Sequence, residues 1–187
     1  MRWYEVNGYF YHGIEFYPGT ILDTIKKCIK IMDEGIELRG IIRGFSDENM
    51  NHICLYHKND EYDYQNHLSL LHSARGGWID GQFVFIIDSD IDAKKAEIGR
   101  ETDLIDEWRC YEKILPEKFV GVALPFDGIQ ELLNEDVDYN EEDKDIVRQY
   151  WNMLIEKVQS MGLILVNSDD KDFTDNFDNQ INNKCQK

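Results

Sequence analysis

The sequence predicts an α+β fold in which several short strands alternate irregularly with a few helices. Three observations support this class. Short runs rich in aromatic and β-branched residues recur along the chain, and few segments have the apolar spacing of an amphipathic helix. No internal repeat or linker divides the 187 residues, of which 42% are hydrophobic, so one core is expected.

The N-terminal elements are two strands and a helix. The stretch "WYEVNGYFYHGI" (3–14) alternates around Asn-Gly, which is typical of a hairpin. The stretch "PGTILDTIKKCIKIMDEG" (18–35) predicts a helix with Thr20 as its N-cap and Gly35 at its end. One face of this helix is apolar and consists of Ile21, Ile25, Cys28, Ile29 and Met32.

The remaining elements are short strands followed by two helices. The stretch "HICLYHK" (52–58) reads as a strand with Ile53 and Leu55 on one face. The stretch "GQFVFIID" (81–88) is a run of apolar and aromatic residues long enough to be a central strand. Further strands are expected at 103–114, 118–125 and 163–167. Helices are expected at 128–135 and 140–162, the second with an inward stripe of Ile146, Tyr150, Leu154, Val158 and Met161.

These elements define a single domain over residues 1–168. Residues 169–187 are polar and show no periodic pattern, so we predict a disordered tail.

Composition limits the cellular compartment and the classes of binding partner that we expect. The formal net charge of −17 favours solubility and disfavours nucleic acid, because phosphate backbones are repelled. No apolar signal core or membrane span is found, and the four widely spaced cysteines form no CxxC pair. We therefore expect a cytoplasmic protein with reduced thiols and no membrane partner.

No metal site is expected. Asp88, Asp90 and Asp92 begin like a calcium loop, but Ala93 and Gly99 occupy the positions of its turn glycine and closing glutamate. The histidines lack zinc spacing, and there is no P-loop, GxGxxG or GxSxG motif.

Three segments taken together resemble a known family. They are "YHG" at 11–13 with its helix, "HICLYHK" with the tyrosine-rich "DEYDY" after it, and "DEWRCYEKILPEKFVGVALP" (106–125). In this order they resemble the ADP-ribosyltransferase fold, in its diphtheria-toxin-like and poly(ADP-ribose) polymerase branch. That branch is marked by His, Tyr and Glu on three separate strands. The resemblance covers residues 9–125 and implies split antiparallel sheets with flanking helices.

The resemblance assigns roles to individual residues. It implies a catalytic triad of His12, Tyr56 and Glu107, with NAD as the substrate. The NAD-binding residues would be His12, Gly13, Tyr56, Tyr62 and Tyr64. Of these, Tyr64 is the preferred nicotinamide-stacking residue and Tyr62 its alternative.

The residue types suit this chemistry. A tyrosine face attracts the flat nicotinamide cation, and glycine allows the backbone to approach its carboxamide. A carboxylate stabilises the positive charge that develops on the ribose when the glycosidic bond breaks. A histidine can hold a ribose hydroxyl. Such residues thus make up a sufficient set for breaking the nicotinamide–ribose bond.

Alternatives remain for each assignment. His12 and Gly13 also suit a strand end at a turn, Tyr56 suits a core, and Glu107 suits an exposed surface. Glu101 and Glu112 compete with Glu107 for the same role. Ile14 stands where the family often has Thr or Ser. The segment "DEWRCYE" lacks the ExE pair of the arginine-specific branch.

The function that the resemblance implies is that of a mono-ADP-ribosyltransferase, and analogy suggests a bacterial toxin or effector, or a host-conflict enzyme, as its setting. It would cleave NAD and transfer ADP-ribose to an acceptor, which we expect to be a protein rather than nucleic acid or a small molecule. The alternative is a catalytically inactive protein of the same fold, an interaction or immunity protein that binds a basic partner through its negative charge.

Overall fold

The structure is a computed structural model that describes residues 8–14, 21–38, 52–57, 83–95, 108–134, 141–170 and 173–185. Its elements confirm the α+β class. The strands are β1 (Tyr9–Ile14), β2 (Ile53–His57), β3 (Phe83–Asp88), β4 (Ala93–Lys95), β5 (Trp108–Cys110), β6 (Phe119–Leu124) and β7 (Ile164–Asn167). The helices are α1 (Ile21–Glu34), α3 (Phe126–Asn134), α4 (Glu141–Ser160) and α5 (Phe173–Cys185), with a 3₁₀ turn at Pro116–Lys118.

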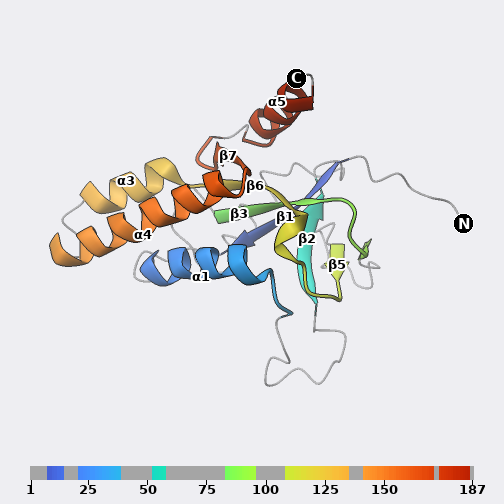
Figure 1. Cartoon of the computed structure of the whole chain (residues 1–187), viewed down its shortest axis with the longest axis horizontal. Helices are drawn as coiled ribbons and strands as arrows, with labels where there is room; N and C mark the ends of the chain where they lie inside the picture. The colour runs from blue at the N-terminus through green and yellow to red at the C-terminus, as the bar shows by residue number, and fades with distance from the viewer. Residues whose placement is uncertain are drawn as a thin grey trace, which may run out of the picture.

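The strands pair in the order β4-β5-β2-β1-β3-β6-β7. All neighbouring pairs are antiparallel except β6 and β7, which run parallel. Helices α1 and α4 cover one face of this sheet, and α5 packs on the other (Figure 1). Both faces are thus covered near the centre.

Coverage on both sides explains the unbroken apolar run of β3. Phe83, Phe85 and Ile87 pack into the larger core beneath α1 and α4, whereas Val84 and Ile86 pack toward α5. Strand alternation divides these residues between the two faces. The prediction of a central strand is confirmed, and all of its residues except the half-buried Asp88 are buried.

Helix α1 follows the predicted pattern except that Ile29 is only half-buried and Ile31 is buried in its place. Its buried residues are Ile21, Thr24, Ile25, Cys28, Ile31 and Met32. The helix ends at Gly35, which has a left-handed φ of 92°. The amide of Gly35 donates to the carbonyl of Ile31 at 2.7 Å and so closes the last turn. Thr20, the predicted N-cap, lies outside the described residues.

Of the expectations for the C-terminal third, one is wrong and another is wrong at one residue. Residues 173–185 of the predicted disordered tail form α5, which buries Phe173 and Phe177 against the sheet. In α4, Ile146 is 37% exposed and the neighbouring Val147 is buried instead. Leu154 and Val158 of the predicted stripe are buried and Tyr150 and Met161 are half-buried, so the buried face departs from the prediction only in the N-terminal part of the helix.

The sheet changes partner at β2. Within the described strands, β1 pairs with β3 over all six of its residues, but with β2 only at Phe10–His57 and Tyr11–Tyr56. The N-terminal half of β2 pairs instead with β5, from Ile53–Cys110 to Leu55–Trp108. Strands β1 and β2 therefore pair with each other at one end only.

Candidate functional site

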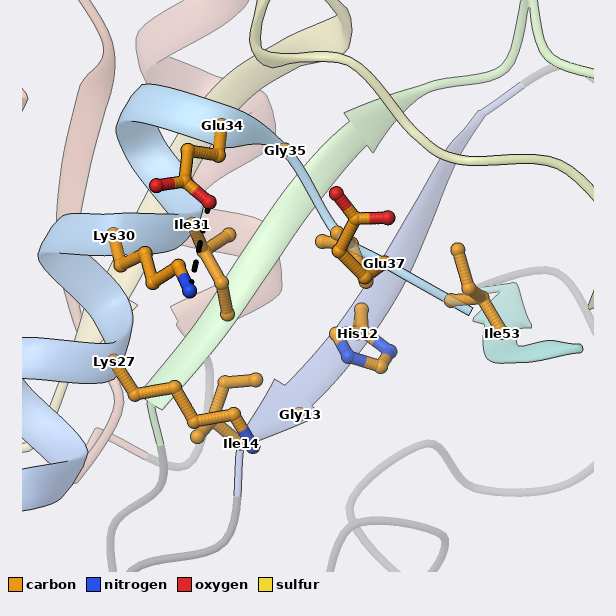
Figure 2. Close-up of a pocket in the computed structure, with 11 residues that line it drawn as sticks. His12, Gly13, Ile14, Lys27, Lys30, Ile31, Glu34, Gly35, Glu37 and Ile53 are labelled. Carbon is orange, nitrogen blue, oxygen red and sulfur yellow. Dashed lines mark ion pairs between the residues drawn. The ribbon is translucent and has the colours of Figure 1, made fainter. Parts of the chain in front are cut away.

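A cleft of about 320 Å³ opens beside the end of β1 that does not pair with β2. Its walls come from β1, α1, the segment after α1 and the start of β2 (Figure 2). The lining residues are His12, Gly13, Ile14, Lys27, Lys30, Ile31, Glu34, Gly35, Ile36, Glu37 and Ile53. The predicted His-Gly pair is therefore part of a cleft.

Strand β1 positions this pair. On the β3 side, His12 is opposite Phe85 and Gly13 is opposite Val84, so that edge of β1 is fixed by the central strand. Neighbouring Phe10 and Ile14 point into the larger core, and alternation puts His12 on their face of the sheet. Both His12 and Gly13 are half-buried, which leaves them accessible from the cleft.

A short segment after α1 forms the opposite wall. The amide of Ile36 donates to the carbonyl of Ile114 at 2.8 Å, and the amide of Ile114 donates back at 3.1 Å. A Cβ on Gly35 would lie only 2.3 Å from that Ile114 carbonyl oxygen. Glycine is required here both by its φ and by this close approach.

Charged side chains surround the cleft. Lys30 pairs with Glu34 at 3.6 Å along α1, and both side chains are largely exposed. Glu37 forms an ion pair with Lys113, which lies beyond β5. Lys27 completes the set from one turn earlier in α1. An apolar floor with a charged rim suits a small polar ligand.

Of the other residues assigned to the site, which are Tyr56, Tyr62, Tyr64 and Glu107, the structure describes only Tyr56. Tyr56 lies in β2, where its backbone is opposite Tyr11. Glu107, Tyr62, Tyr64 and the rival Glu101 lie outside the described residues.

Glu112, the second rival of Glu107, is described. It is an exposed residue just after β5, and it is absent from the lining of the cleft.

The strand order nevertheless places β5, β2 and β1 next to one another in the sheet. Strand β2, with Tyr56, lies between β1, with His12, and β5, which begins at Trp108, the residue after Glu107. The register does not oppose His12 to Tyr56, because His12 is one residue beyond the Tyr11–Tyr56 pair.

The two described cysteines with buried side chains are poor nucleophiles. Burial raises the pKa of the Cys28 thiol to about 12. Burial also raises the pKa of Cys110, whose thiol donates to the carbonyl of Glu112. Nucleophilic catalysis needs the thiolate, which is scarce at neutral pH in both cases.

In the described ranges, no three His, Cys, Asp or Glu side chains are grouped so as to hold a metal ion. Among the described helices, including the 20-residue α4, none carries the continuous apolar stretch that a membrane span requires.

Sequence reasoning did not single out the four charged residues of the cleft. Lys27, Lys30 and Glu34 follow a spacing of three and four residues, so they share one helix face directly after the His-Gly strand. That spacing was the available signal. Glu37 offered none, because its place depends on the contact between Ile36 and Ile114.

No protein-family model, curated protein or solved structure matches this chain.

Proposed function

We propose that the protein is an NAD-dependent mono-ADP-ribosyltransferase with its active site at the cleft beside His12 and Gly13. The observation that carries the proposal is that the pairing between β1 and β2 ends at Tyr11, so that it does not extend to His12 and Gly13. A sheet that divides there gives a flat ligand access to strand backbone, which a continuous sheet would cover. This arrangement supports the split-sheet form of the fold.

The cleft offers groups for the nicotinamide half of NAD. Ile31 and Ile53 supply apolar surface for a planar ring. The backbone at Gly13 can approach the carboxamide closely, and the His12 imidazole can hydrogen-bond a ribose hydroxyl. A volume of about 320 Å³ is near the lower end of ligand pockets, roughly 300–1,000 Å³, so the cleft would hold one half of the dinucleotide.

The reaction itself requires little covalent chemistry from the protein. The bond between the nicotinamide nitrogen and the ribose breaks, and nicotinamide leaves as a neutral molecule with the bonding electrons. A nucleophile of the acceptor then bonds to the ribose carbon and loses its proton. Glu107 would stabilise the positive ribose and orient that nucleophile. The adjacency of β5, β2 and β1 supports this assignment.

Glu107→Gln tests the assignment. This change keeps the shape of the side chain and removes its charge, so NAD affinity should stay within a few-fold. Nicotinamide release from NAD should fall by about a hundredfold or more, the usual scale for one preorganised electrostatic group. The matched controls Glu101→Gln and Glu112→Gln should retain most of the activity.

Loss of turnover in one control, with Glu107→Gln fully active, would move the catalytic role to that glutamate. Full activity in all three variants would reject the triad.

A second candidate is an inactive protein of this fold that binds a basic partner. The offset between His12 and Tyr56 and the net charge of −17 favour it. A thermal-shift titration separates the two candidates, because a ligand that binds the native state raises the unfolding temperature. An enzyme should be stabilised by NAD or nicotinamide, whereas an inactive protein should respond to neither.

A further inference from the structure

We propose that Lys27 of α1 is the phosphate-binding residue of the cleft. This inference rests on the proposed function and goes one step further, because it assigns the recognition of the diphosphate in the ligand to one side chain. It also predicts which end of the cleft the diphosphate occupies.

The position of Lys27 is the first argument. Lys27 is exposed, and it lines the cleft together with Gly13 and Ile14. Its side chain extends from α1 toward the Ile14 end of β1 (Figure 2). A ligand seated on His12 and Gly13 would therefore have this ammonium group at one of its ends.

The second argument is the pairing of the neighbouring cations. Lys30 pairs with Glu34, Lys113 pairs with Glu37, and Lys26 lies 4.9 Å from the centre of the Tyr150 ring. Across the part of the chain that the structure describes, no carboxylate forms an ion pair with Lys27.

A chain with 37 acidic and 20 basic residues offers carboxylates in excess. Among the described residues, Lys27 is the lysine of the cleft lining that has no carboxylate partner, since Lys30 pairs with Glu34. The Lys27 ammonium is thus available to an anion that the ligand brings.

The third argument is the asymmetry of charge. Glu37 lies above His12, whereas Lys27 lies at the Ile14 end (Figure 2). A phosphate near Glu37 would meet a carboxylate that Lys113 already neutralises and would gain little there, whereas one near Lys27 would be attracted. The base and its ribose should therefore lie toward His12 and Glu37, with the diphosphate toward Ile14. This orientation selects a phosphorylated nucleotide over the free base.

The test is a calorimetric titration of Lys27→Gln with NAD and, separately, with nicotinamide. Lys26→Gln is the matched control, since it removes the same charge from the residue directly before Lys27 in the same helix. For Lys27→Gln we expect NAD to bind about five- to tenfold more weakly and nicotinamide to bind as it does to the wild type. Wild-type affinity for NAD should also fall more steeply with added NaCl than that of Lys27→Gln.

Three outcomes would overturn the inference. Unchanged NAD affinity in Lys27→Gln would remove the residue from ligand recognition while leaving the proposed function intact. Equal weakening of NAD and nicotinamide would show general damage to the cleft instead of phosphate recognition. If wild-type protein binds neither compound, the proposed function fails, and this inference fails with it.

Discussion

Asp169 caps a helix from a distant part of the chain. Its Oδ2 accepts hydrogen bonds from the amides of Asp127, at 2.7 Å, and Gly128, at 3.3 Å, in the first turn of α3. The residue before this helix is Pro125, whose side chain offers no acceptor, so a local cap is impossible. Asp169 therefore joins the end of β7 to the start of α3.

This cap has a predictable pH dependence. Burial raises the pKa of Asp169 above its usual value, although the two amide bonds oppose the shift. The folded state consequently binds a proton more tightly than the unfolded state does. The stabilising contribution of protonation is thus present below the unfolded pKa of about 4 and is lost as pH rises through the folded pKa.

Asp169→Asn keeps an acceptor for the amides and removes the titration. As pH is lowered from 7 toward about 4, wild type should gain free energy of unfolding relative to Asp169→Asn in urea titrations. Asp169→Ala should lose about 1 kcal/mol at pH 7, because the cap is gone. A wild-type advantage over Asn that shrinks on acidification would contradict this account.

At the same scale, His12 and Gly13 were predictable because they are adjacent in sequence and their strand has a clear pattern. Tyr56 was a weaker prediction, since its relation to His12 depends on the register of β1 against β2. A shift of one residue in register reverses the face of every side chain on a strand, and sequence alone does not fix it.

Helix α1 is the element that builds the cleft, and Gly35 is where it meets the rest of the fold. Gly35→Ala should destabilise the protein by about 2 kcal/mol or more, from the strained φ and from the clash with the Ile114 carbonyl. Guanidinium unfolding measures this loss. NAD binding should weaken as well, because Ile36 and Glu37 would move.

Gly162→Ala provides the matched control. Gly162 also has a left-handed φ, of 69°, but an added Cβ would meet no atom within 4 Å. It should therefore lose only the conformational part, about 1 kcal/mol. Equal losses in the two variants would mean that the approach of Gly35 to Ile114 carries no cost.

Helix α5 shows why a polar segment can be misjudged. Phe173, Phe177 and Ile181 recur every four residues and face the sheet, but the residues between them are polar and acidic. The Phe177 ring packs where Gly121 has no side chain, since a Cβ there would lie 2.5 Å from the ring. A helix anchored by so few apolar residues forms because the sheet supplies their partners.

At the scale of the whole molecule, the α+β class and the central position of β3 followed from hydrophobic patterning. The strand order and the place where β1 and β2 part did not, because they depend on pairings between distant segments. The charged side of the cleft depends on the same long-range contacts. The glutamate expected to carry the chemistry lies outside the described residues, so its role remains a prediction.

The central claim is that NAD binds at the cleft beside His12 and Gly13. The most direct test is an NMR titration of protein labelled with ¹⁵N-glycine, whose 13 glycines give few resonances. Gly13→Ala, Gly35→Ala and Gly162→Ala assign three of them. Added NAD should shift the amide resonances of Gly13 and Gly35 and leave that of Gly162 in place. NAD that moves neither Gly13 nor Gly35 would contradict the account.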